Sequence, residues 1–90
     1  MNKAQRKQLK LLREQSAQLT SDLEAVKDEL EEMRDEEQDK LDNLPESLLG
    51  SCREDEFQNG INALDVVVDG LDSALTSLED ANEAFEEMSL

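Results

Sequence analysis

The chain has 90 residues with 24 acidic and nine basic side chains, a formal net charge of −15, and no His, Trp or Tyr. A chain of this length forms one small domain with little core, and such chains often associate. The acidic charge disfavours binding to nucleic acid or to an anionic membrane, and two Phe residues do not provide the aromatic anchors of a large binding pocket.

The sequence also indicates the cellular compartment of the protein. Cys52 is the only cysteine, so no disulfide can form within the chain. There is no secretory apolar segment and no apolar run long enough to cross a membrane. We therefore expect a reduced, soluble protein of the cytoplasm.

The first expected helix covers residues 2–43. Its apolar residues alternate three and four positions apart, with Ser16 as the one polar exception, and the spacing resumes at Leu41 and Leu44. This is the a/d heptad pattern of a coiled coil, in which one stripe faces a partner helix. The stripe consists of Leu9, Leu12, Ser16, Leu19, Leu23, Val26, Leu30 and Met33, with Leu9 at position a.

The connector is expected at about residues 44–51, within DNLPESLLGS. Pro45 has no N–H for a continuing helix, and it disfavours the helical conformation of the residue before it. Gly50 can adopt a left-handed turn, and Ser51 with Glu54 fits a capping box. These residues predict that one helix ends and a second begins here.

The second expected helix covers residues 52–88. Its a and d positions, with Ile61 at a, are Phe57, Ile61, Leu64, Val68, Leu71, Leu75, Leu78, Asn82 and Phe85. A further row at position g widens the apolar stripe to about three positions per heptad, which is more than a two-stranded seam requires. This row consists of Gly60, Val67, Ala74, Ala81 and Met88.

The sequence thus predicts an all-α fold, an antiparallel helical hairpin that forms a single domain over residues 1–90. The e positions of the first helix are mostly basic (Arg6, Arg13, Thr20, Lys27, Arg34), and those of the second are mostly acidic (Gln58, Asp65, Asp72, Glu79, Glu86). Because e faces e in an antiparallel pair, the two rows should meet. The short connector favours a register in which facing residue numbers sum to about 94. A register near 101, with Ser16 beside Phe85 and an overhanging N-terminus, is the alternative.

The wide stripe on the second helix needs further cover. We expect a symmetric homodimer that forms an antiparallel four-helix bundle. Asn82 then either fixes the register or the oligomeric state, or is a frayed polar position near the chain end. The expected oligomer interface is Leu64, Val67, Val68, Leu71, Ala74, Leu75, Leu78 and Ala81.

Residues for catalysis are lacking, and we expect no enzyme, no cofactor and no metal. The acidic run over residues 28–39 could offer oxygen ligands to Ca²⁺ or Mg²⁺, but one helix splays such side chains around its circumference. Cys52 lies at a helix start that could activate it, although an ordinary thiol is the more common case. The basic stretch over residues 3–13 could contact a polyanion, although pairing within the hairpin already requires Arg6 and Arg13.

The acidic EEQ run at Glu36–Gln38, the DNLPESL turn at Asp42–Leu48 and the helical pattern around them resemble small acidic helical proteins of bacteriophages and prophages, a largely uncharacterised group. The resemblance brings no catalytic residue. It implies a small accessory protein in the host cytoplasm, of a kind that often binds and blocks a host factor.

The function that we expect is that of a non-enzymatic acidic coiled-coil interaction protein. In sharper form, it is a phage inhibitor that occupies a basic surface of a host nucleic-acid-binding or defence protein, as DNA mimics do. The candidate recognition surface is Asp35, Glu36, Asp39, Glu54, Asp55, Asp69 and Asp80. The alternative is a structural spacer or assembly component with no separate recognition surface, and the acidic charge can also serve solubility alone.

Overall fold

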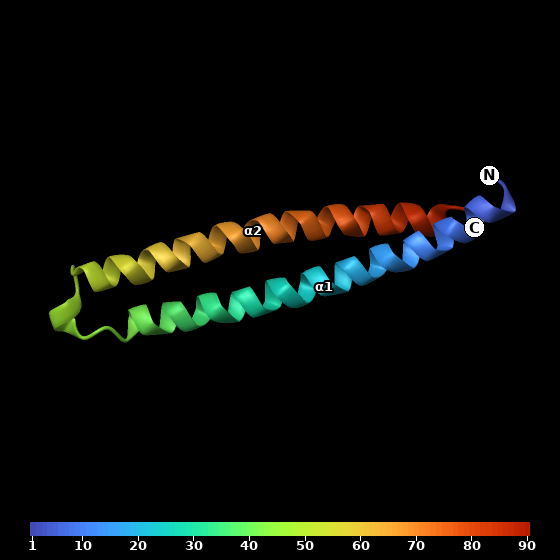
Figure 1. Cartoon of the computed structure of the whole chain (residues 1–90). Coiled ribbons are helices and arrows are strands. Elements are labelled where there is room, and N and C mark those ends of the chain that lie inside the picture. Colours follow the sequence, from blue (N-terminus) through green and yellow to red (C-terminus); the bar gives the residue numbers. More distant parts are fainter.

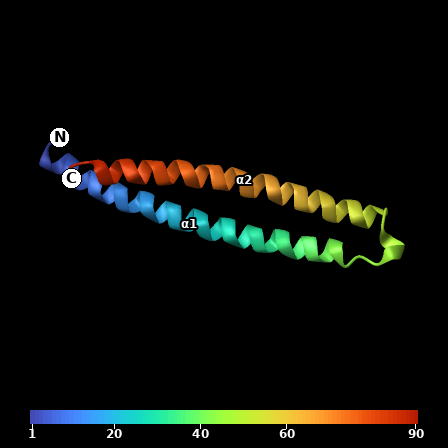
Figure 2. The same ribbon diagram turned by 180° about the vertical axis from the view of Figure 1, so that it is seen from behind.

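A computed structural model describes residues 1–90 as two long helices folded back on one another (Figure 1). The elements are α1 (Lys3–Asp42), a short 3₁₀ turn η1 (Glu46–Leu48) and α2 (Cys52–Glu87). The chain spans 70 × 15 × 14 Å, and the view from behind shows the same antiparallel pair, with both termini at one end (Figure 2). The predicted helical hairpin is confirmed.

Helix α1 begins with a capping box that the sequence analysis did not predict. The Asn2 side chain accepts a hydrogen bond from the Gln5 N–H at 2.8 Å, and the Gln5 side chain accepts one from the Asn2 N–H at 3.0 Å. Two of the N–H groups that a helix start leaves without partners are thereby satisfied. The helix ends at Asp42, three residues before Pro45.

The connector confirms one local prediction and corrects another. Gly50 has φ +77°, the left-handed conformation expected of it. Ser51 is the residue before α2, but its hydroxyl donates to the Leu48 carbonyl, and the Glu54 carboxylate accepts from the Gly50 N–H. The predicted Ser51–Glu54 capping box is therefore wrong, because both side chains bind connector backbone groups that the turn leaves open.

The register of the two helices lies between the two that were considered. Lys27 pairs with Asp72 and Arg34 with Asp65, so these residue numbers sum to 99, while Ser16 bonds to Asn82 at a sum of 98. The preferred sum of 94 is wrong, and the observed value is closer to the alternative near 101. The chain continues past the end of α1 before it turns, so α2 begins about one helical turn beyond that end (Figure 1).

The two helices turn different heptad positions toward each other. On α2 the a and d residues are buried or half-buried, as predicted. On α1 the half-buried residues include the a positions Leu9, Leu23 and Leu30 and the e positions Lys27 and Arg34. The d residues of α1 were expected in the seam but are 43–58% exposed; they are Leu12, Leu19, Val26 and Met33.

This rotation follows from the register. At sums of 98 to 99, a positions face a positions, and the e positions of α1 face the d and e positions of α2. The long stems of Lys27 and Arg34 can lie along the apolar seam while their charged ends reach α2 carboxylates. Only Ile61 and Leu75 are buried, so the hairpin encloses very little core.

Candidate interaction surfaces

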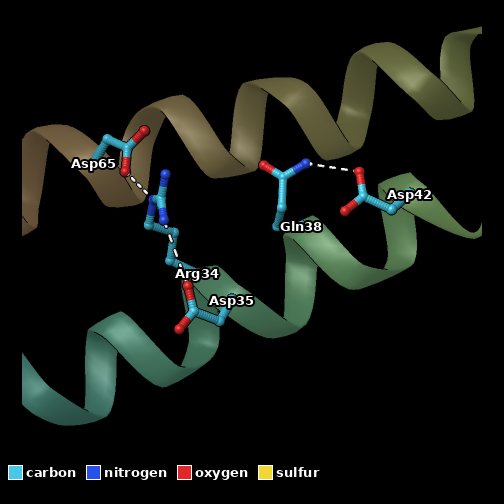
Figure 3. A network of polar contacts seen from close by, with 5 residues as sticks. All are labelled: Arg34, Asp35, Gln38, Asp42 and Asp65. Carbon is cyan, nitrogen blue, oxygen red and sulfur yellow. Dashed lines mark hydrogen bonds and ion pairs between the residues drawn. The ribbon is translucent and has the colours of Figure 1, made fainter.

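Ion pairs run along one side of the seam. The Lys27 ammonium lies 3.0 Å from the Asp72 carboxylate, and the Arg34 guanidinium binds Asp65. Figure 3 shows the Arg34 side chain between Asp65 of α2 and Asp35 of its own helix, whose carboxylate is 3.4 Å away. Both cross-helix pairs join e positions, so the predicted meeting of a basic and an acidic row is confirmed for these two pairs.

The other e-row predictions have different outcomes. Arg13 and Arg6 take part in no ion pair. At the observed register the end of α2 at Glu87 is level with about residue 11 of α1, so Arg6 lies beyond α2. The turns of α1 before residue 11 therefore extend past α2. We call residues 3–13, which include these turns and Arg13 beside the last turn of α2, the basic overhang. Four of its side chains line a shallow hollow with Leu90; they are Lys3, Arg6, Lys7 and Lys10.

The hydrogen bond from Lys27 to Asp72 raises the pKa of Lys27 above its ordinary value of 10.5. Partial desolvation acts in the opposite direction, and the negative charges of Asp72 and Glu31 add to the increase. The ammonium form is therefore the one that the hairpin stabilises.

The remaining basic side chains after Glu14 are also engaged. Lys40 lies 2.9 Å from the Glu37 carboxylate, and the Arg53 guanidinium lies over the Phe57 ring, 5.8 Å from its centroid. Residues 14–90, which we call the acidic body, hold all 24 acids against four bases, a net charge of −20. Five of these carboxylates take part in ion pairs, and the others keep their charge unmatched; the five are Glu31, Asp35, Glu37, Asp65 and Asp72.

The hairpin brings most of the predicted acidic surface to one end. Asp35, Glu36 and Asp39 lie in the last turns of α1, and Glu54 and Asp55 lie in the first turn of α2, so these five flank the connector. All are exposed except Glu54, which is half-buried and binds the Gly50 N–H.

The other two predicted residues of this surface are elsewhere. Asp69 and Asp80 are exposed on α2, about 20 Å and 40 Å along the helix from Glu54 at 1.5 Å per residue. The seven residues therefore do not form one patch. Five of them lie around the connector end of the rod, and the other two lie farther along α2.

The features of the hairpin that bear on a chemical site are its acidic side chains, the Cys52 thiol and a hollow at the connector. No group of three or more Cys, Asp or Glu side chains converges as metal ligands would. The Cys52 thiol is free and exposed. A shallow hollow at the connector is lined by neutral and basic residues, among them Leu44, Pro45 and Phe57.

Asn82 lies inside the seam, in a cluster of polar side chains. Its Oδ1 accepts from the Ser16 hydroxyl, and its Nδ2 donates to Thr20 Oγ1 at 2.8 Å. Thr20 Oγ1 in turn donates to the Ser16 carbonyl at 3.1 Å. Asn82 is thus a paired residue that favours this register over its neighbours, and it is not a frayed position.

The predicted oligomer interface is divided by the hairpin. Leu75 is buried and Leu64, Val68, Leu71 and Leu78 are half-buried at the a and d positions that face α1. Val67, Ala74 and Ala81 are exposed. The first group therefore lies in the intramolecular seam, and only the second group is open to another molecule.

A surface that the sequence analysis missed adjoins this second group. In an antiparallel pair the e rows meet on one side and the g rows on the other, so the d row of α1 lies on the same side as the g row of α2. The c row of α2 continues this surface with Ala63, Gly70, Ser77 and Ala84, all exposed. We call the combined surface the apolar face; it consists of Leu12, Leu19, Val26, Met33, Ala63, Val67, Gly70, Ala74, Ser77, Ala81 and Ala84.

A signal for the apolar face was present in the sequence. The d row of α1 is apolar from Leu12 to Met33, whereas the a row is interrupted by Ser16 and Glu37. The small residues of α2 also alternate four and three apart, as a second heptad seam does. The sequence analysis assigned the d row of α1 to the seam and the g row of α2 to surplus width, because the rotation of α1 about its own axis was unknown.

Neither long helix contains an apolar stretch that would suffice to cross a bilayer. No protein-family model, no curated protein and no solved structure matches this chain.

Proposed function

We propose that the protein is a non-enzymatic coiled-coil interaction protein whose acidic body binds a basic surface of another protein. The observation that carries this proposal is the unmatched charge of the acidic body. Its four basic side chains are held in ion pairs or over an aromatic ring, so they are not available to offset the carboxylates that face outward. The surface that remains attracts cations along its whole length.

The charge density indicates the class of partner. A net charge of −20 is spread along about 60 Å of the 70 Å rod, which is roughly one charge per 3 Å. Single-stranded DNA carries one charge per 3.4 Å and the duplex one per 1.7 Å. A protein that binds a nucleic-acid backbone would therefore meet a field of similar sign and strength. Together with the resemblance to phage proteins, this supports an inhibitor of a host nucleic-acid-binding or defence protein in the host cytoplasm.

The test begins with capture of partners from a host lysate at about 0.1 M salt, where screening between charges is still modest. We expect a basic nucleic-acid-binding protein that DNA displaces in competition, with affinity falling as salt is added. If no such protein is captured, or if DNA does not compete, the proposal is wrong.

Paired variants then locate the contact. The triple variant Asp35→Asn, Asp39→Asn, Asp55→Asn removes three charges at the connector end and is expected to weaken binding about tenfold or more, since each exposed ion pair contributes up to about 1 kcal/mol. The control Glu24→Gln, Glu83→Gln, Asp28→Asn removes three exposed charges farther from the connector. It should weaken binding less than threefold. Equal effects of the two variants would contradict a contact at the connector end.

A structural spacer is the second candidate, and the rod shape with its exposed apolar face favours it. In that case both triple variants would leave activity unchanged. Substitutions in the apolar face would then abolish activity.

A further inference from the structure

The apolar face has the direction that a four-helix bundle requires. At 100° per residue, the d row of α1 lies about 80° from the middle of its a/e contact stripe, and the g row of α2 lies about 90° from the middle of its a/d stripe. In such a bundle each helix contacts two neighbours in roughly perpendicular directions. Both rows therefore point to the same side of the hairpin, at right angles to the contact that the hairpin already makes.

The area of the hairpin also suits a second copy. The accessible surface is 6650 Å², whereas a compact monomer of this mass exposes about 5,300 Å². The excess of roughly 1,300 Å² covers the 800 Å² or so that each partner buries in a stable interface.

The apolar face is complementary to itself when the second copy runs in the opposite direction. If facing residue numbers on the two α1 helices sum to 45, Leu12 is level with Met33 and Leu19 with Val26. The intramolecular register then places the small residues of the two α2 helices at the same level, because their numbers sum to about 151. The resulting pairs are Val67 with Ala84, Gly70 with Ala81, and Ala74 with Ser77.

Two dimers can bury the apolar face: one packs α1 on α1 of the second copy, and the other packs α1 on α2. The distribution of charge favours the first. With the second copy reversed, the basic overhang of residues 3–13, which has five bases and no acid, is level with residues 32–42 of the other copy, which have six acids and two bases. In the competing arrangement α1 packs on α2 of the second copy, and both basic overhangs lie at the same end. Ten basic side chains would then gather at that end, and the two acidic connectors would gather at the other.

We propose that the apolar face binds a second copy of this chain in reversed orientation. In this dimer α1 packs on α1 and α2 on α2, and each basic overhang lies beside the acidic connector end of the other copy. The dimer does not depend on the acidic body having a protein partner.

The first test measures mass by light scattering. The wild-type chain should have about twice its mass of 10.2 kDa. Val26→Lys places a charge in the interface twice, once per copy, and should weaken the dimer about a hundredfold. Val66→Lys is the matched control, because Val66 is 72% exposed and lies outside the apolar face. It should leave the mass unchanged.

A second variant disrupts the same interface from the other helix, so that the conclusion does not depend on Val26 alone. Ala74→Gln adds a long polar side chain to the small-residue row of α2, and Gln is a good helix former. It should also produce monomers, with helical circular dichroism retained. A wild-type chain that is monomeric at about 100 μM, or a dimer that survives both Val26→Lys and Ala74→Gln, would overturn the proposal.

The second test measures orientation with the native cysteine. Cys52 is the only thiol and is exposed, so a nitroxide label can be attached without any substitution. In the reversed dimer the two labels lie at opposite ends, about 70 Å apart by helix rise. Dipolar spectroscopy should find this long distance, and one below about 30 Å would overturn the reversed orientation. Neither measurement involves a protein partner, so the function proposed above is tested separately.

Discussion

The two helices have the same heptad pattern but contribute unequally to the hairpin. Both buried side chains, Ile61 and Leu75, belong to α2, and α1 contributes none. Helix α2 turns two apolar rows inward, whereas α1 turns inward one mixed row and one row that includes Lys27 and Arg34. A heptad repeat therefore identifies the apolar rows of a helix, but it does not determine which of them meet the intramolecular partner.

The largest expected effect comes from the same substitution made in each helix. Leu75→Ala should lower the free energy of unfolding by about 2–4 kcal/mol, because it leaves a cavity at a buried site. Leu19→Ala, at a residue that is 58% exposed, should cost less than about 1 kcal/mol. Urea unfolding at a concentration where the chain is monomeric measures both. Equal losses would remove the contrast between the helices. If the loss for Leu19→Ala becomes larger in a second titration at higher protein concentration, this would support the dimer proposed above.

An intermediate effect is expected at the polar cluster. Asn82→Ala should lower the free energy of unfolding by about 1–2 kcal/mol, because the Ser16 hydroxyl then loses its acceptor in the seam. Asn62→Ala is the control: Asn62 is exposed and accepts only from Gln58 of its own helix, and it should cost about 0.5 kcal/mol or less. Both values come from the same urea titration. A loss no larger for Asn82→Ala than for the control would contradict the role of the cluster.

The smallest effect concerns pH. Because folding raises the pKa of Lys27, its contribution to stability is fully present below its unfolded pKa, near 10.5, and is lost as pH rises through the higher folded value. The melting temperature of the wild-type chain should therefore fall above pH 10. In Lys27→Gln this part of the decline should be absent. Lys7→Gln, at a residue without an ion pair, should keep it, and identical profiles for the two variants would contradict the assignment.

Much of the fold could be predicted from the sequence, because its causes are local or periodic. Pro45 ends the first helix by chemistry that does not depend on tertiary structure, and the apolar repeats on either side require the helices to pack. For the same reason the opposed charges of the e rows predicted that basic side chains of α1 meet acidic side chains of α2, as Arg34 and Lys27 do with Asp65 and Asp72.

The register could not be predicted, because it depends on the path of the connector. A difference of four in the residue sum corresponds to about one helical turn of α2, and it arises from the way in which residues 43–51 leave α1. The backbone dihedrals of these residues decide this path, and the sequence DNLPESLLGS permits several turns. Once the register changed, the rotation of α1 changed as well, and Leu12 to Met33 moved from the expected seam to the surface.

The candidate surfaces could be predicted only in part, because the positions of their residues also depend on how the hairpin is arranged in space. Acids near the connector lie at one end of the rod, because any hairpin turn brings Asp39 and Asp55 there. Asp69 and Asp80 lie farther along α2, which was not predicted, because a list of acidic residues in the sequence does not give the distances between them. The three interface residues that remain open, Val67, Ala74 and Ala81, belong to the g row that the sequence already marked as surplus.

The separation of charge along the rod has a consequence for motion. With five bases at one end and a net charge of −20 over the remainder, a monomer has a large electric dipole along its 70 Å axis. Near a positively charged surface the resulting torque turns the rod so that its connector leads and its termini trail. First encounters of the monomer with a basic molecule would then be end-on, with the side of the rod engaging only afterwards.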